Sequence, residues 1–486
     1  MDVTGETKEP GAFPGRSAPD AGPPPALDRP LHLRHYSAGV RLRHDSPAPA
    51  GPPPWTHPDA YWPALSAAVQ GRALPTVTLD ATALEHNAGD LVRRAQGLPI
   101  RVASKSLRSR PVIEAVLARP GFAGVLAYTL AEAVWASGWC EDVVLGYPTA
   151  DRAAVEQLVS DAAACERVTL MVDSTDHLDL VDAVRPPDRR PEVRVAIELD
   201  LAYDPPRAAR LTGRVGVYRS PVATVEAARE LARQVVARPG FRLVGVMGYE
   251  AQLAGVGDAL PPASGVADRA RTAAGAARTL LVRRLQASSW ADVLQRRGAM
   301  VAAIADVAGG LELVNGGGTG SVHLTRQDPS VTEVAAGSGL FGPTLFDAYR
   351  SFTPAPATAF ALPVVRRPSP DIATVLGGGW IASGPAGPTR VPTPVWPQRV
   401  GLVANEGAGE VQTPLRGPGA RDLAVGDLTW WRHAKAGELS EHANELVVVR
   451  SRSSAPGASG ADAVRAVEAV VEDVVPTYRG EGKAFL

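Results

Sequence analysis

The sequence predicts an α/β protein in which a closed (β/α)8 barrel of the TIM type is followed by an antiparallel β domain. From residue 76, short runs rich in Val, Leu and Ile alternate with Ala-, Arg- and Glu-rich stretches of helical period. Eight or nine such units within about 265 residues favour a closed parallel barrel over an open sheet. After Asp347 the pattern changes to short β segments between glycines and prolines, which predicts a second, all-β domain.

The 486 residues suit two or three domains, and composition divides them into four parts. Residues 1–55 contain 12 of the 44 prolines and little apolar periodicity, so we expect a disordered tail there. Residues 56–100 hold a helix and a strand, 101–345 the barrel, and 346–486 the β domain.

The expected elements follow from these periods. Strands of the first region are expected at 76–80, 101–105, 124–129, 142–148, 168–174, 194–200, 243–250, 313–317 and 333–339. Helical stretches are expected at 83–98, 111–117, 130–138, 152–164, 225–237 and 268–307, the last being longer than one crossover requires. The β domain is expected to have strands at 359–365, 373–376, 399–404, 427–431 and 445–449, with a closing helix at 462–475.

Charge and cysteine content exclude several classes of protein. Lys and Arg total 50 and Asp and Glu total 51, so the net charge of −1 leaves no basic excess for nucleic acid. No stretch approaches the roughly 20 apolar residues of a membrane span. Two cysteines, Cys140 and Cys165, are too few for a disulfide framework, and no secretory signal precedes the first domain. We therefore expect a soluble cytoplasmic protein that acts on a small molecule.

Lys105 ends the first predicted barrel strand. Because the active site of a (β/α)8 barrel lies at the carboxyl ends of its strands, this amine is expected at the barrel mouth. A lysine placed there can act as a covalent catalyst toward carbonyl groups. A solvated lysine at a strand end is the other interpretation of the same residue.

Two glycine-rich segments follow the last two predicted barrel strands. The first is Asn-Gly-Gly-Gly-Thr-Gly-Ser at 315–321, and the second is Gly-Ser-Gly at 337–339. Glycines let backbone N–H groups approach a phosphate, and the hydroxyls add further donors. Loops after strands seven and eight of a barrel typically hold a ligand's phosphate, which favours this interpretation over two ordinary turns. A lysine after strand one and a phosphate site after strands seven and eight together indicate pyridoxal 5′-phosphate (PLP).

On these residues the sequence resembles the fold type III PLP enzymes, the alanine racemase-like group. Within it, the sequence looks most like the low-specificity D-threonine aldolase and D-serine dehydratase branch, in the form called amino acid deaminase/aldolase. The resemblance covers about residues 60–450, and it rests on the order of Leu79-Asp80, Asn87, the segments 101–106, 214–217 and 245–252, and the two glycine segments. It implies that strand 76–80 joins the β domain, which leaves eight barrel strands, and that the protein is a homodimer.

The resemblance also implies roles for individual residues. Lys105 would hold PLP covalently, Tyr249 would lie beside the pyridine ring, and Arg214 would lie near the phenolic oxygen of that ring. The phosphate would be bound by Gly317, Gly318, Thr319, Gly320, Gly337, Ser338 and Gly339.

Two segments depart from the relatives that the sequence resembles. Alanine racemases have an Arg-Pro-Gly stretch whose arginine faces the pyridine nitrogen, whereas residues 335–337 here read Ala-Ala-Gly. Relatives that act on β-hydroxy amino acids bind a divalent metal through a His-x-Cys or His-x-Asp pair, and here the pair is His433 and Lys435. An ammonium repels a cation, so the ligands of any divalent metal are unknown from the sequence. Glu410, Glu438 and Glu441 could complete a site or form a solvated acidic face.

The implied function is a PLP-dependent lyase acting on β-hydroxy amino acids, D-configured by family analogy. Retro-aldol cleavage would give an aldehyde and glycine, and dehydration with deamination would give an oxo acid and ammonia. His433 is the candidate base or metal ligand near the β-hydroxyl, and Lys435 is a candidate to polarise it. An amino-acid racemase and a non-catalytic PLP-binding protein are the alternatives, although barrel-only carriers of this superfamily lack a β domain.

Overall fold

The computed structural model describes residues 39–43, 52–205, 213–259, 268–385, 387, 389–453 and 466–486, with the side chains of the long helix described from residue 275. Most of the tail predicted at 1–55 lies outside these residues. Residues 36–486 form one unit, which contains both the barrel and the β domain.

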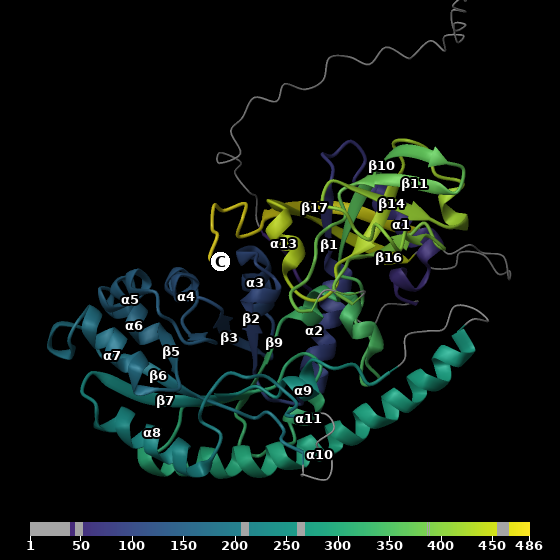
Figure 1. Cartoon of the computed structure of the whole chain (residues 1–486). Coiled ribbons are helices and arrows are strands. Elements are labelled where there is room, and N and C mark those ends of the chain that lie inside the picture. Colours follow the sequence, from purple (N-terminus) through teal and green to yellow (C-terminus); the bar gives the residue numbers. More distant parts are fainter. Residues whose placement is uncertain are drawn as a thin grey trace, which may run out of the picture. The chain divides into compact units, whose positions relative to one another are not determined.

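A closed barrel of eight parallel strands forms the first domain (Figure 1). It closes where β9 pairs with β2, with Ile100 opposite Val334 and Val102 opposite Ala336. The predicted barrel is confirmed, and so is the exclusion of the strand at 76–80 from it. The barrel strands are β2 (Ile100–Ala103), β3 (Phe122–Ala127), β4 (Val143–Leu145), β5 (Val168–Val172), β6 (Val193–Leu199), β7 (Phe241–Gly248), β8 (Leu313–Gly316) and β9 (Glu333–Ala336).

Helices follow the barrel strands, as the alternating pattern predicts, and one further helix, α2, lies between the strand at 76–80 and the first barrel strand. The longest, α10 (Asp268–Ala308), is a single helix of 41 residues that packs against α8. Figure 1 shows it running past the barrel as one continuous helix. The others are α2 (Ala81–Ala95), α3 (Arg110–Leu117), α4 (Leu130–Ala136), α5 (Arg152–Val159), α6 (Ala162–Arg167), α7 (Thr175–Val184), α8 (Val225–Ala237), α9 (Ala251–Ala254), α11 (Val322–Thr325) and α12 (Ser338–Phe341).

The second domain is a mainly antiparallel sheet that includes β1, a strand that precedes the barrel in the sequence. β1 lies between β10, to which it is antiparallel, and β16, to which it is parallel. The sheet strands are β1 (Thr76–Asp80), β10 (Thr358–Ser369), β11 (Ile372–Leu376), β12 (Thr393–Trp396), β13 (Gly401–Leu402), β14 (Gln412–Arg416), β15 (Leu428–Arg432), β16 (Glu445–Ser453) and β17 (Val467–Pro476). Two helices, α1 (Pro58–Ala68) and α13 (Glu438–His442), belong to this domain, and short 3-10 turns occur at Pro54–Thr56, Ser104–Ser106, Pro187–Arg189, Thr344–Ala348 and Pro418–Ala420.

The predicted closing helix at 462–475 is wrong. Residues 454–465 lie outside the described residues, and Val467–Pro476 is strand β17, which pairs antiparallel with β16 from Glu445↔Pro476 to Ser453↔Val467. Side-chain exposure alternates along most of β17, and the segment is rich in valine, which favours strands. The Glu and Ala residues of this segment are typical of the exposed face of a helix. Pairing with β16 over the whole length of that strand nevertheless makes the segment extended.

The two faces of the β sheet have different partners because successive side chains of a strand point to opposite sides. Val447 and Val449 of β16 pack with Tyr61, Trp62 and Leu65 of α1. Leu446 and Val448 join the large core that continues into the barrel. β16 is thus covered on both sides along most of its length.

The β domain is fastened to the chain around Lys105 by hydrogen bonds. Ser440 of α13 donates its hydroxyl proton to Leu107 O at 2.8 Å, and Ser109 donates to Pro476 O at 2.7 Å. The Tyr478 N–H donates to Arg108 O at 2.7 Å. These contacts hold the second domain over the end of β2, where the first predicted catalytic residue lies.

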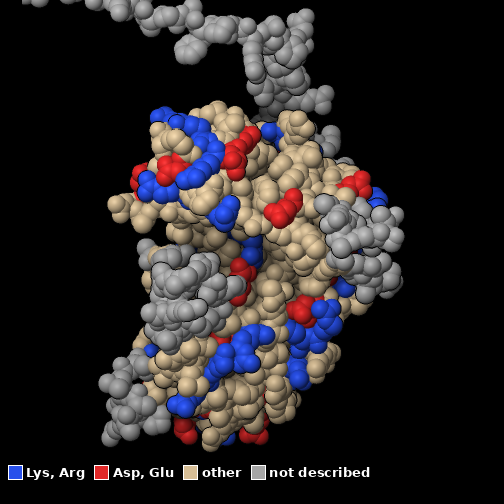
Figure 2. Space-filling model, turned by 90° about the vertical axis from the view of Figure 1, so that its right-hand side faces the viewer, with Lys and Arg blue, Asp and Glu red and all other residues tan. Residues whose placement is uncertain are grey.

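The surface carries both signs of charge. On the face in Figure 2, lysine and arginine side chains are interspersed with aspartate and glutamate, in keeping with the net charge of −1. Among the helices of the described segments, none combines the length and apolar character needed to cross a membrane.

Glu132 makes stability depend on pH. Burial raises its pKa to about 7, although hydrogen bonds from Ser104, Tyr128 and Tyr478 oppose the shift. The folded state therefore keeps the carboxyl neutral while the unfolded chain ionises near 4.5, so stability present below 4.5 is lost as the pH rises to about 7. We expect Glu132→Gln to remove up to about 3 kcal/mol of this pH dependence, measured by urea unfolding. Equal pH slopes in the two proteins would contradict this assignment.

Candidate active site

A cavity of about 390 Å³ lies between the carboxyl ends of the barrel strands and loops of the β domain. Its volume is within the usual range for small-ligand sites. One wall consists of residues at or after the ends of β2, β3, β4, β6, β7, β8 and β9, and the other carries Leu345, Phe346, Arg390, Lys435 and Ala436.

Lys105 lies in this cavity, directly after β2. The backbone leaves the strand at Ala103 and forms a 3-10 turn, in which the Ser104 hydroxyl donates to Leu126 O of β3 at 3.1 Å. Gly437 of the β domain packs against this turn so closely that a Cβ there would lie 2.3 Å from Lys105 O. The turn is therefore held from both domains.

Tyr147 is the direct partner of Lys105. It follows β4 and lines the cavity, and Lys105 Nζ donates to its hydroxyl at 2.9 Å. Burial raises the pKa of the Tyr147 phenol, but the charges of Lys105 and Arg219 lower it more, so this pKa lies below its usual value. The pair can exchange a proton without a bridging water.

Arg219 lies between two tyrosine rings. Its guanidinium carbon is 5.2 Å from the ring centroid of Tyr147 and 5.1 Å from that of Tyr249. Arg219 Nη1 is also 3.6 Å from Glu198 Oε1. Burial raises the pKa of Glu198 to about 7, although the nearby Arg219 cation lowers it. Tyr249 itself lines the cavity, and burial raises its pKa to about 12, so its hydroxyl stays protonated at neutral pH.

The two glycine segments meet at the cavity wall. Thr319 Oγ1 accepts from the Gly339 N–H at 3.1 Å and lies 3.4 Å from Ser338 Oγ. Gly337 packs against β2, where a Cβ would lie 2.4 Å from Ala103 O. Of the seven residues predicted to bind phosphate, five line the cavity (Gly317, Gly318, Thr319, Gly337 and Ser338), whereas Gly320 and Gly339 are not part of the lining.

The opposite wall is cationic. Lys435 Nζ donates to Ser383 O at 3.1 Å, and burial together with the charges of Arg390 and Lys105 lowers its pKa. The Nε of Arg390 is buried and has no hydrogen-bond partner among the described residues. Among the described lining residues the charged ones are Lys105, Arg219, Arg390 and Lys435, with no carboxylate. Such a cavity favours an anionic ligand.

Two predicted site residues lie away from the cavity lining. Arg214 pairs with Asp200, and its guanidinium carbon is 5.1 Å from the ring centroid of Tyr218. His433 is fully buried, with Nδ1 3.3 Å from Thr358 Oγ1, and burial lowers its pKa to about 4. The predicted roles of these two side chains at the reacting centre are not supported by this geometry.

The residues near His433 do not fit a divalent metal. Its Nε2 has no hydrogen-bond partner among the described residues, but Glu438 accepts hydrogen bonds from Lys435 N at 2.6 Å and Ala436 N at 2.7 Å. Glu441 pairs with Arg108, and Glu410 is exposed. In the part of the chain that the structure describes, no cluster of three His, Cys, Asp or Glu side chains is placed to hold a metal ion.

Tyr147, Arg219 and Arg390 line the cavity but are not among the site residues predicted from the sequence. Tyr147 ends the apolar run at 142–148, so the rule that placed Lys105 at a strand end would also have selected it. Arg219 and Arg390 come from irregular segments, whose path no local periodicity indicates.

The arrangement as a whole is the alanine racemase-like fold. No protein-family profile and no curated protein matches the chain. Solved structures do match it. D-threonine aldolase from Filomicrobium marinum superposes with a TM-score of 0.65 at 17% identity, covering 84% of this chain and 95% of that one.

Two further structures agree. D-threo-3-hydroxyaspartate dehydratase from Delftia sp. HT23 gives a TM-score of 0.58 at 18% identity, with 84% of this chain and 98% of that one covered. An alanine racemase-like protein from Idiomarina loihiensis gives 0.55 at 14% identity, with 80% and 95% covered. The predicted barrel with a β domain is thus confirmed as the fold of this group.

The close packing of the glycine segments predicts the effect of a substitution. A Cβ at Gly339 would lie 2.4 Å from Thr319 Cγ2, so Gly339→Ala should destabilise the protein by about 1–3 kcal/mol. The control is Gly298→Ala in α10, where a Cβ would meet nothing within 4 Å. This substitution should stabilise the protein by about 0.5–1 kcal/mol, because alanine favours a helix more than glycine does. Urea unfolding measures both, and equal stability of the two variants would contradict the prediction.

Proposed function

We propose that the protein is a PLP-dependent lyase acting on β-hydroxy amino acids of D configuration, by retro-aldol cleavage or by dehydration and deamination. The observation that carries this proposal is that Lys105 and both glycine segments line one cavity, opposite the cations Lys435 and Arg390. The D configuration is supported by the names of the two lyases with the same fold.

The lining residues fit PLP. Lys105 Nζ would hold the cofactor covalently, Tyr249 and Arg219 would lie along its ring, and the segments at Thr319 and Ser338 would bind its phosphate through N–H and hydroxyl groups. When bound, PLP supplies an electron sink for negative charge that develops on the α carbon of an amino acid.

The cationic wall would bind the substrate. Arg390 has an unpartnered buried Nε that can donate to the α-carboxylate, and its planar guanidinium suits that group. Lys435 would donate to the β-hydroxyl and polarise it, at the sequence position where the relatives that the sequence resembles have a metal ligand. Tyr147 Oη would hold and return the proton that Lys105 Nζ exchanges, since the two atoms are 2.9 Å apart.

The stretch Ala335-Ala336-Gly337 favours a lyase over a racemase. Both alanines line the cavity, and Ala335 stands at the place where the racemases that the sequence resembles have an arginine. β9 would therefore bring no cation to the pyridine nitrogen of bound PLP. This lack of a charged partner distinguishes the cavity from that of the racemases that the sequence resembles.

The first test is the visible absorption spectrum of the purified protein with PLP. We expect an absorption band that borohydride removes, and we expect Lys105→Ala to lack it because Nζ is the attachment point. Lys483→Ala serves as the control, because the Lys483 ammonium lies 5.9 Å from the ring centroid of Trp135 on α4 and outside the cavity lining. A colourless protein that takes up no added PLP would refute the proposed function.

The second test assays D-threonine, D-serine and their L forms for aldehyde, oxo acid and ammonia. We expect Lys435→Met to lower kcat/KM for the best substrate roughly 10- to 100-fold, because a charge-assisted hydrogen bond of about 1.5–3 kcal/mol is lost. Lys483→Met should leave kcat/KM unchanged. Exchange of the α proton in both enantiomers without aldehyde or oxo acid would instead identify a racemase.

The third test is removal of divalent metal. Because the donor set near His433 does not fit a metal, we expect dialysis against a chelator to change kcat/KM less than twofold. Loss of activity on chelation and its recovery with added Mn²⁺ or Zn²⁺ would contradict this expectation.

A further inference from the structure

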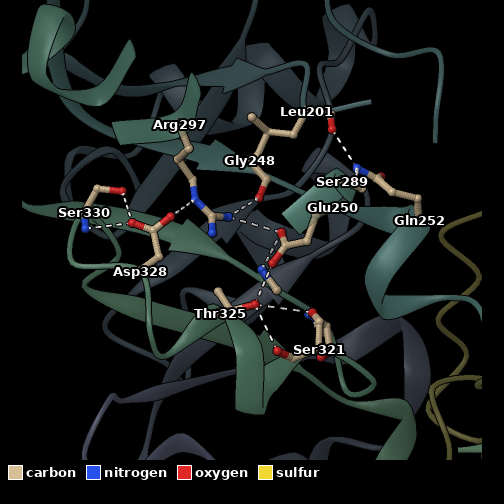
Figure 3. A network of polar contacts seen from close by, with 12 residues as sticks. Leu201, Gly248, Glu250, Gln252, Ser289, Arg297, Ser321, Thr325, Asp328 and Ser330 are labelled. Carbon is tan, nitrogen blue, oxygen red and sulfur yellow. Dashed lines mark hydrogen bonds and ion pairs between the residues drawn. The ribbon is translucent and has the colours of Figure 1, made fainter. Parts of the chain in front are cut away.

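A buried polar network lies behind the first glycine segment (Figure 3). Arg297 of α10 donates from Nε to Asp328 Oδ2 at 2.7 Å and from Nη1 to Glu250 Oε2 at 3.2 Å. The side chains of Arg297 and Glu250 have no solvent exposure, and that of Asp328 is 1% exposed. None of the three lines the cavity, so none is expected to touch a ligand.

Glu250 accepts hydrogen bonds from both ends of residues 317–325, which overlap the first glycine segment. Its Oε2 accepts from the Gly317 N–H at 3.0 Å, and its Oε1 accepts from the Thr325 hydroxyl at 2.5 Å. Gly317 lies within the first glycine segment, residues 315–321, and Thr325 ends helix α11, which follows that segment. One carboxylate, held by Arg297, therefore fixes the start and the end of residues 317–325.

The glycines at this point also make room for the network. A Cβ at Gly316 would lie 2.7 Å from Arg297 Nη1, and a Cβ at Gly317 would lie 2.9 Å from Thr325 Oγ1. Gly317 has a φ of +79°, which side-chain-bearing residues rarely adopt. The backbone of the segment therefore contacts the Arg297–Glu250 pair on one side and the cavity on the other.

We infer that Arg297 and Glu250 are positioning residues for a phosphate group bound at the glycine segment 317–320. Glu250 accepts from the Gly317 N–H and thereby fixes the backbone at the start of this segment, of which Gly317, Gly318 and Thr319 line the cavity. Arg297 donates to Glu250 Oε2 and so holds this carboxylate behind the phosphate site. The long helix α10, whose purpose the sequence does not indicate, thus supports this site, and the inference rests on the proposed function for the identity of the ligand.

The test compares PLP with pyridoxal, which lacks the phosphate. Full-length protein freed of cofactor is titrated with each compound, and the ratio of their dissociation constants measures the contribution of the phosphate. We expect Glu250→Gln and Thr325→Val to raise the Kd for PLP about tenfold and to change the Kd for pyridoxal less than about twofold. Thr325→Val is the milder change, because it removes one hydroxyl and no charge.

The matched control is Thr429→Val in the β domain. Thr429 is also fully buried and donates to a backbone oxygen, Leu362 O, at 3.1 Å. A purely structural loss of a buried hydroxyl should lower the unfolding temperature in both threonine variants but change the ratio in neither. An unchanged ratio in Glu250→Gln and Thr325→Val, or equal weakening of both ligands, would overturn the inference.

A second readout separates this inference from the proposed function. Inorganic phosphate should raise the unfolding temperature of the wild-type protein and of Thr429→Val, and do so less in Thr325→Val, with chloride at equal ionic strength as reference. If the wild type binds neither PLP nor pyridoxal, the proposed function fails. A phosphate effect reduced in Thr325→Val would then still support the positioning role, and an equal effect in all three proteins would refute it.

Discussion

Closure of the barrel depends on one buried ion pair. Arg101 of β2 donates to both carboxylate oxygens of Glu333 on β9, each at 2.7 Å, and to Asp142 Oδ2 at 2.7 Å. Asn315 of β8 donates to the same Glu333 at 2.8 Å. Although burial opposes it, these carboxylates raise the pKa of Arg101 and keep it charged. Loss of Arg101 would leave the buried Glu333 carboxylate without its cation, at a cost of about 3–5 kcal/mol.

The positions of the functional groups follow from that closure. Because β9 pairs with β2 and β8 pairs with β9, the glycine segments after these two strands come to lie in one cavity with Lys105. The β domain completes the cavity with a second, cationic wall, which is held by hydrogen bonds to residues 107–109. Neither domain alone has both the lysine and the cationic wall.

The fold alone does not decide the reaction, since the same fold occurs in an aldolase, a dehydratase and an alanine racemase-like protein. In this chain the reaction is set by the groups that face the cavity. The alanines at 335–336 leave one side without charge, and Lys435 adds a cation at the position where the relatives that the sequence resembles have a metal ligand. Tyr147 gives Lys105 a proton partner within the cavity itself.

The sequence by itself determined the barrel and the β domain. It also determined that Lys105 and the two glycine segments follow barrel strands. Strand period and strand ends are local properties, and in a closed parallel barrel all strand ends meet at one rim. Only the tertiary structure decided that Arg219 rather than Arg214 lines the cavity, that His433 is buried beside Thr358, and that 467–476 is a strand. Each of these depends on packing between segments far apart in the chain, and no local pattern encodes such contacts.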